Sequence, residues 1–249
     1  MINILLPLAG RSNFFENERF PKALIEINGT SMIQYAIDYL RSIKRPTRFI
    51  FVIRANDSIR FHLDNTLALL APTNSIIVRQ EGDTKGAVCS CLLAIEHINN
   101  EDPLIISNAD QFINHNIEEV IDEFEKKKTD GGVICFDSVH PQWSYARLDS
   151  NSNVLQTAEK NPISRNAIAG FYYFRQGADF VRAAQDSILN RADVNGLYYI
   201  APTYNELILE GKTIAMHIID KRCYHSFYSL QKIEEFEKAT MSNRLGIKV

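Results

Sequence analysis

The chain has 249 residues, of which 45% are hydrophobic and 23% charged. This is the usual balance of a globular domain whose core is large enough to be stable without disulfides or metal ions. Its net charge of −3 gives no general attraction to nucleic acid or to anionic lipid, so we expect neither nucleic acid nor a membrane as a partner. The four cysteines have neither CxxC spacing nor histidines at zinc spacing, and we expect reduced thiols and a cytoplasmic protein.

Up to residue 128 the sequence alternates short apolar runs with runs of helical period. The first apolar run, at residues 1–6, is too short for a signal-peptide core or a membrane span. The predicted strands are residues 3–8, 48–53, 75–78 and 104–107, and the predicted helices are residues 32–40, 59–70, 85–98 with Thr84 as N-cap, and 117–127. This alternation predicts an α/β fold with a mostly parallel sheet covered on both faces. Ligands of such sheets bind beyond the carboxyl ends of the strands.

After residue 128 the pattern changes to strands with short connections, followed by helices. The predicted strands are residues 131–136, 145–148, 154–158 and 167–174, and the predicted helices are residues 178–189, 199–210 and 230–239. The sequence contains no repeat, low-complexity tract or linker. We therefore predict one domain, residues 1–249, in which residues 1–128 form a nucleotide-binding half and residues 129–249 form an acceptor-binding half that completes the same sheet.

The end of the first strand is rich in small residues, Leu8, Ala9 and Gly10. Small side chains let backbone N–H groups approach a nucleotide closely. The polar loop that follows carries Arg11, is long for a compact α/β unit, and ends at Lys22 after a proline that restrains the backbone. We expect Lys22 and Arg11 to neutralise charge on phosphates. The plainer interpretation is an ordinary strand exit and a solvated lysine.

A second loop, from Gln80 to Ala87, follows a strand and opens a helix. Gly86 and Ala87 leave the first helical turn uncluttered, and a helix N-terminus of this kind suits a base edge, a ribose or a phosphate. We assign Gln80, Gly86 and Ala87 to nucleotide binding. Simple capping by Asp83 or Thr84 explains the pattern equally well.

A third segment, Asn108 to Asp110, follows a buried strand. An acid at this position faces the crevice beyond the strand ends. Mg²⁺ takes oxygen ligands and needs only one or two protein carboxylates, because phosphates and water complete its shell. We predict Asp110 as the metal ligand and a catalytic residue, with Asn108 beside it in the nucleotide site. The alternative for Asp110 is a turn aspartate.

In the second half, Glu159 and Lys160 follow a predicted strand. A carboxylate can accept hydrogen bonds from sugar hydroxyls, and a lysine can hold a phosphate. We predict acceptor binding for this pair, against the alternative of a solvated charge pair before a turn. For the only tryptophan, Trp143, we favour packing over stacking on a ligand.

These segments together resemble the sugar-phosphate nucleotidyltransferase (pyrophosphorylase) family. The resemblance covers residues 1–230, and the stretch 195–205 looks like the subgroup found in bacterial capsule and surface-polysaccharide clusters. It implies a Rossmann-like, three-layer nucleotide-binding fold and a Mg²⁺-dependent reaction that joins a nucleoside triphosphate to a phosphorylated sugar. The implied contacts are those of Leu8, Ala9 and Gly10 with the nucleotide, Lys22 with the phosphates, Gly86 and Ala87 near the base, Asp110 with Mg²⁺, and Glu159 and Lys160 with the acceptor.

The sequence departs from this family's pattern at two places. Ser12 and Phe14 stand where the family usually has a second loop glycine and an arginine. The stretch 228–233 lacks the second acidic metal ligand that the family often has, and Asp220, although close in sequence, is not favoured as a substitute.

Two other functions are weighed against nucleotidyl transfer. One is a GT-A-type glycosyltransferase that uses a nucleotide-sugar donor and has less need of Lys22. The other is a nucleotide-binding protein without turnover, which the two departures motivate. The base, the acceptor (a phosphorylated non-sugar included) and the oligomeric state, a homo-oligomer included, are left open by the sequence.

Overall fold

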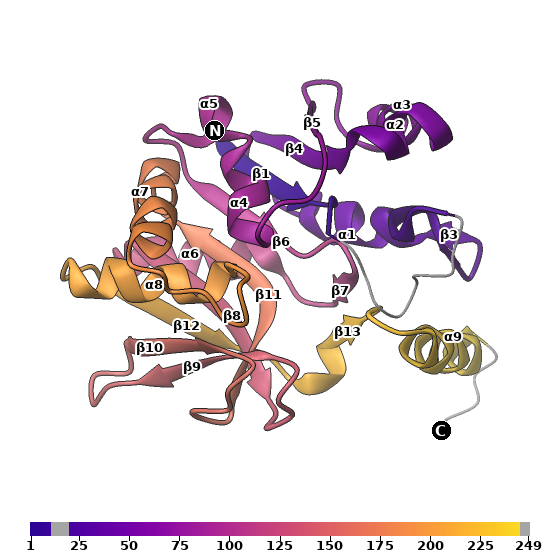
Figure 1. Ribbon diagram of the computed structural model, residues 1–249. Helices are drawn as coiled ribbons and strands as arrows, with labels where there is room; N and C mark the ends of the chain where they lie inside the picture. Colours follow the sequence, from indigo (N-terminus) through magenta and orange to yellow (C-terminus); the bar gives the residue numbers. More distant parts are fainter. Residues whose placement is uncertain (11–19, 245–249) are drawn as a thin grey trace.

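The structure is a computed structural model that describes residues 1–10 and 20–244, with side chains up to residue 240 (Figure 1). The strands are β1 (Ile2–Pro7), β2 (Glu26–Ile27), β3 (Thr30–Ser31), β4 (Thr47–Arg54), β5 (Ile76–Gln80), β6 (Leu104–Ser107), β7 (Gln111–Ile113), β8 (Gly131–Asp137), β9 (Ser144–Leu148), β10 (Val154–Glu159), β11 (Asn166–Phe174), β12 (Ile214–Ile218) and β13 (Tyr224–Ser226). The helices are α1 (Met32–Leu40), α2 (Ala55–Phe61), α3 (Leu63–Leu70), α4 (Ala87–Leu92), α5 (Ile95–Ile98), α6 (Ile117–Lys126), α7 (Gly177–Leu189), α8 (Ile200–Leu209) and α9 (Leu230–Arg244), with 3₁₀ turns η1 (Lys22–Leu24) and η2 (Lys221–Cys223). Within these described residues, no helix combines the length and apolar character that crossing a membrane requires.

A large mixed sheet organises the described part of the chain, with strand order β10-β9-β11-β6-β1-β4-β5 and with β8 and β12 joined to it through β11. The strands of the first half, β6, β1, β4 and β5, pair in parallel. The strands β8 to β11 add antiparallel pairs. The predicted α/β fold with a mostly parallel mixed sheet is confirmed. Because β1 and β6 are parallel neighbours, the residues that follow them emerge at the same edge.

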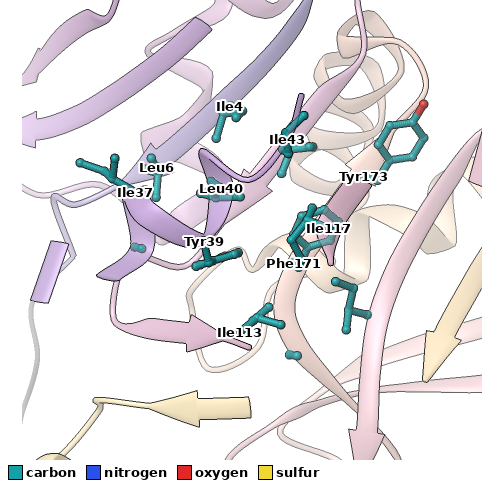
Figure 2. Packing of buried hydrophobic residues seen from close by; sticks show 14 of the residues in the cluster. Ile4, Leu6, Ile37, Tyr39, Leu40, Ile43, Ile113, Ile117, Phe171 and Tyr173 are labelled. Atoms are coloured by element: carbon teal, nitrogen blue, oxygen red, sulfur yellow. The ribbon is translucent and has the colours of Figure 1, made fainter. Parts of the chain in front are cut away.

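Alternating side chains of the central strands fill two apolar layers, one on each face of the sheet. On β1, Ile4 and Leu6 point to the layer that contains residues of α1, α3 and α6, whereas Leu5 points to the layer that contains residues of α4, α7 and α8. Figure 2 shows the first layer, where Ile4 and Leu6 face Ile37 and Leu40 of α1. This three-layer arrangement holds the strand ends in fixed positions.

Several predicted element boundaries need correction. The predicted helix 59–70 is two helices, α2 and α3, separated at His62, whose backbone is left-handed with φ of 52°. The predicted helix 85–98 is also divided, into α4 and α5. Thr84 is not its N-cap: Gly86 holds that position, and the Thr84 hydroxyl bonds with that of Ser90 instead.

The C-terminal segment returns to the first half of the chain, which the sequence pattern did not indicate. Strand β13 pairs with β7, so that Ser226 lies opposite Gln111. Helix α9 then packs on the β2–β3 hairpin through Phe236 and Ile233, which share a small apolar cluster with Ile27 (Figure 1). The end of the described chain therefore lies against the segment that follows Lys22.

Candidate active site

Lys22 and Asp110 meet at the carboxyl ends of β1 and β6. Lys22 Nζ lies 2.5 Å from Asp110 Oδ2, and the two side chains are 22% and 32% exposed. Lys22 opens the η1 turn directly after Pro21, and buried Ala23 anchors that turn in the core. The partly exposed pair is therefore held in place, yet it remains open to a ligand.

A small cavity of about 160 Å³ surrounds this pair. It brings together predicted nucleotide-site residues from three separate segments: the end of β1, the η1 turn and the loop after β6. Its lining residues are Pro7, Leu8, Gly10, Lys22, Ala23, Met32, Asn108, Ala109 and Asp110. Arg11, Ser12 and Phe14 lie outside the described residues.

A buried hydrogen-bond network under Asp110 fixes the loop after β6. The side-chain amide of Gln111 donates to Gly170 O at 3.1 Å and to Tyr39 Oη at 3.2 Å. Tyr224 Oη donates to Gln111 Oε1 at 3.3 Å. Burial raises the pKa of Tyr39 to about 12, so its hydroxyl keeps its proton at neutral pH. Neutral donors and acceptors thus position Asp110 without a competing charge.

Gly170 permits a close approach of β11 to this loop. Its φ of 57° lies in the left-handed region, where the β8–β11 register shifts. The backbone N–H of Asn108 donates to Gly170 O at 2.9 Å. A β-carbon at Gly170 would overlap the side-chain amides of Asn108 and Gln111. The sequence alone did not single out Gly170, although a glycine inside a strand is a recognised signal of a bulge.

The second predicted loop, residues 80–87, is joined to the loop after β1 through Arg54, which contacts both. Gly86 has a φ of 103°, and a β-carbon there would lie 2.5 Å from Tyr198 O. Ala87 opens α4 and lines the larger pocket described below. Gln80 is buried under the loop: its amide donates to Gly82 O at 3.0 Å, and its Oε1 has no hydrogen-bond partner within the described part of the chain.

Arg54, at the end of β4, is a residue that the sequence reasoning missed. Its Nε donates to Ala9 O at 2.8 Å, and a terminal nitrogen donates to Asp83 Oδ1 at 2.9 Å. Ala9 itself is buried. An arginine directly after an apolar parallel strand could have been noticed as a strand-end residue.

A larger pocket of about 530 Å³ continues from the small one, because Asn108 and Asp110 line both. Glu159 and Lys160, at the end of β10, also line it, and α8 and β13 supply further walls. The remaining lining residues are Ala87, Gln142, Trp143, Ser144, Ile168, Gly170, Tyr172, Tyr199, Ile200, Tyr224, Ser226 and Tyr228.

The charged pair in this pocket is divided between two environments. Ser144 Oγ donates to Glu159 Oε2, and burial raises the pKa of the Glu159 carboxyl. Lys160 is exposed; its Nζ donates to Tyr199 Oη at 2.8 Å and lies 4.8 Å from the centre of that ring. Lys160 also has a left-handed backbone with φ of 53°, a strained conformation of the kind that occurs at functional sites.

Trp143 both packs and lines the pocket. Its ring meets those of Phe136 and Tyr224 edge to face, with centroids 5.6 Å apart in each case. The packing interpretation is therefore incomplete, because the same ring also forms pocket wall.

The donor set around Asp110 fits a magnesium ion that is completed by a ligand's phosphates. Asp110 is the one carboxylate among the described residues of the small cavity, and one carboxylate suffices when phosphates and water supply the other oxygens. The C-terminal segment presents Tyr224, Ser226 and Tyr228 here, not a second acid. Asp220 is exposed and lines neither pocket, and its carboxylate accepts hydrogen bonds from Arg222. Across residues 1–10 and 20–244, no cluster of three or more His, Cys, Asp or Glu side chains is arranged to hold a metal.

The fold and the two connected pockets define an α/β enzyme of the nucleotide-binding class. Residues 17–205 match the model of the nucleotidyl transferase family. The chain therefore belongs to this family and is a nucleotidyltransferase. No curated protein matches the chain.

Solved structures show the same fold at low sequence identity. A nucleoside-diphosphate-sugar pyrophosphorylase from Vibrio cholerae RC9 is 24% identical, with a TM-score of 0.81 over 94% of this chain and 99% of its own. A UDP-glucose pyrophosphorylase in complex with UDP-glucose is 16% identical, with a TM-score of 0.77 over 98% and 100%. A Bacillus anthracis protein, assigned provisionally as a glucose-1-phosphate thymidylyltransferase and bound to sucrose, is 14% identical, with a TM-score of 0.71 over 100% and 96%.

Proposed function

We propose that this nucleotidyltransferase is Mg²⁺-dependent, that it joins a nucleoside triphosphate to a phosphorylated sugar or similar small phosphorylated acceptor, and that it releases pyrophosphate. One observation carries the proposal: Lys22 and Asp110 meet where the small cavity opens into the larger one. An activated precursor for surface polysaccharide, made in the cytoplasm, is the role that the sequence resemblance supports.

In the proposed reaction, an oxygen of the acceptor phosphate attacks the α-phosphorus in line and forms a new P–O bond. The bond from the α-phosphorus to the oxygen that bridges it to the β-phosphorus breaks, and its electron pair leaves with pyrophosphate. The acceptor phosphate attacks as an anion, so no side chain needs to remove a proton from it. Positioning and charge neutralisation are then the main contributions of the protein.

The Lys22 ammonium stands where it can neutralise charge on the α- or β-phosphate. Asp110 is the residue that would hold Mg²⁺, and the bound ion would supply charge neutralisation and orientation of the phosphate oxygens. Asn108, exposed beside Asp110, is available to hydrogen-bond the same phosphates. The reacting phosphorus would therefore lie at the junction of the two pockets.

The nucleotide would lie over the ends of β1 and β5. Leu8, Ala9 and Gly10 offer backbone on one side, and Gly86 and Ala87 leave space on the other. Gln80 Oε1, which has no hydrogen-bond partner among the described residues, is a candidate acceptor for a base amino group if the loop above it moves aside. Glu159 and Lys160 would meet the acceptor in the larger pocket.

The competing functions have weaker support. A GT-A-type glycosyltransferase has no triphosphate to bind, whereas this chain places a lysine against the candidate metal ligand and belongs to the nucleotidyl transferase family. Binding without turnover would fit a distorted site, but the buried network under Asp110 has its donors and acceptors paired.

The test is a matrix of CTP, UTP, GTP and dTTP against phosphorylated acceptors, with pyrophosphate release measured in the presence of Mg²⁺. We expect the wild-type protein to release pyrophosphate with one of the triphosphates. Lys22→Ala should lower the turnover by about 100-fold or more, which is the loss typical of a phosphate-stabilising group. The control is Lys126→Ala, which removes the same charge from the exposed face of α6. Near-normal release by the Lys22 variant would refute its role, and triphosphate binding without release for any acceptor would favour the non-catalytic function.

A further inference from the structure

The carboxylate of Glu159 lies in the larger pocket, and among the described residues no ammonium or guanidinium is bonded to it. Its hydrogen-bond donor is the Ser144 hydroxyl. The neighbouring Lys160 ammonium donates to Tyr199 Oη instead. The Ser144 hydroxyl and the charge of Lys160 both act to lower the pKa of the Glu159 carboxyl. Burial outweighs them, so that this pKa is raised. A half-buried carboxylate of this kind gains most from a ligand that brings a positive charge.

The pocket walls around Glu159 are aromatic. Five rings line it: Trp143, Tyr172, Tyr199, Tyr224 and Tyr228. Two of the hydroxyls are already engaged, that of Tyr199 with Lys160 and that of Tyr224 with Gln111. A ligand in this pocket therefore meets five aromatic rings and the carboxylates of Asp110 and Glu159, while the Lys160 ammonium is bonded to Tyr199. Aromatic rings and a carboxylate attract a cation, with the largest gain where water is excluded.

Building on the nucleotidyl transfer proposed above, we infer that the acceptor is a phosphate monoester that carries an amine or a quaternary ammonium group. Its phosphate lies at the Asp110 end of the pocket, and its cationic group lies at the Glu159 end between the aromatic rings. The pocket volume of about 530 Å³ is within the range of small-molecule sites. A neutral acceptor could offer Glu159 hydrogen bonds, as Ser144 does, but no opposite charge, whereas the cation offers one.

The position of Trp143 allows a direct binding test. It is the only tryptophan of the chain and lines this pocket, so its fluorescence reports occupancy without turnover. Two ligand pairs differ in charge but little in shape: 2-(trimethylammonio)ethyl phosphate against 3,3-dimethylbutyl phosphate, and glucosamine 1-phosphate against glucose 1-phosphate. We expect the cationic member of at least one pair to bind the full chain about tenfold or more tightly than its neutral counterpart.

Glu159→Gln removes the charge and keeps the shape, so the cation preference should fall to about twofold or less. Glu96→Gln makes the same charge change on the exposed face of α5 and should keep the preference. Equal binding of the cationic and neutral members in both pairs, no binding of either cationic ligand, or a preference that persists in Glu159→Gln would overturn the inference.

Pyrophosphate release from the same ligands separates this inference from the proposed function. Release with a neutral sugar phosphate but with no cation preference refutes the inference alone. A cation preference in binding with no pyrophosphate release for any triphosphate refutes nucleotidyl transfer to these acceptors and leaves the cation site established.

Discussion

Arg54 and Ala9 are joined by a hydrogen bond of 2.8 Å from the guanidinium Nε to the carbonyl oxygen. The same guanidinium donates to Asp83 at 2.9 Å. One side chain at the end of β4 thus connects the loop after β1 with the loop before α4. These are the two loops between which we place the nucleotide.

Replacing Arg54 with glutamine should weaken nucleotide binding more than it slows the chemical step. Loss of two hydrogen bonds from a charged donor should raise the KM for the triphosphate about tenfold, while kcat changes by less than about threefold. Steady-state pyrophosphate release gives both constants. Arg60→Gln, an exposed change on α2, is the control, and an unchanged KM in the Arg54 variant would contradict the bridging role.

Gly170→Ala should lower both activity and stability. The left-handed backbone at Gly170 and the overlap with Asn108 and Gln111 should lower the free energy of unfolding by about 2 kcal/mol. The displaced amides flank Asp110, so we expect pyrophosphate release to fall by about tenfold or more even where the variant is fully folded.

Gly211→Ala separates strain from overlap. Gly211 also has a positive φ, of 81°, but a β-carbon there meets open space. This variant should lose about 1 kcal/mol of stability and keep its activity. Urea unfolding and pyrophosphate release on both variants test the comparison, and equal activities would argue against a positioning role for Gly170.

Asp110→Asn should abolish the response to Mg²⁺. The amide keeps the shape but removes the negative charge that a hard divalent cation prefers. We expect kcat to fall by about 100-fold or more, as on chelation of the metal from the wild-type protein by EDTA. A Mg²⁺ titration of the two proteins measures the difference.

Asp220→Asn is the matched control for the metal assignment. Asp220 is the acid close in sequence to the stretch 228–233. It lines neither pocket and pairs with Arg222. Its substitution should leave the Mg²⁺ dependence unchanged. If Asp220→Asn instead raised the Mg²⁺ concentration needed for half-maximal activity, the single-carboxylate site would have to be abandoned.

His115 should make the fold less stable in weak acid. Its Nε2 lies 3.1 Å from His217 Nε2, and His217 Nδ1 lies 2.6 Å from Glu123. Burial first, and the charge of His217 second, lower the pKa of His115, with Glu119 acting in the opposite direction. Lys127, which pairs with Glu123, is the other charged group of this cluster.

A lowered pKa means that the unfolded chain binds a proton at His115 before the folded chain does. Stability is therefore retained above pH 6.5 and falls as the pH drops through and below that value. We expect the thermal midpoint to fall between pH 7.5 and 5.5, and to fall less in His115→Asn. An identical pH dependence in the two proteins would show that His115 does not contribute.

The apolar strand runs were predictable because parallel, centrally placed strands are buried on both faces. The meeting of Lys22 and Asp110 was predictable because both residues follow parallel strands whose carboxyl ends share one edge of the sheet. The short strands β7, β12 and β13 were not predicted. Strands β7 and β13 have only three residues each and contain polar side chains. The pairing of all three strands depends on partners far away in the sequence.

The sequence also could not show what Arg54 and Gly170 do. Arg54 acts through contacts with Ala9 and Asp83 across different strands, and local periodicity has no information on such contacts. Gly170 matters because of its φ angle and its approach to Asn108. The predicted role of Thr84 as a cap was wrong because Gly86, without a β-carbon, approaches Tyr198 and takes the N-cap position.

The return of β13 and α9 to the first half has a consequence for synthesis. Phe227 donates its backbone N–H to Asp110 O at 2.8 Å, and Glu237 accepts from the backbone of Asn28 at 3.0 Å. Both contacts join residues near the C-terminus to segments translated early. A nascent chain that has not yet released residues 227–240 from the ribosome would lack these supports, so catalytic competence should arise only after this segment has emerged.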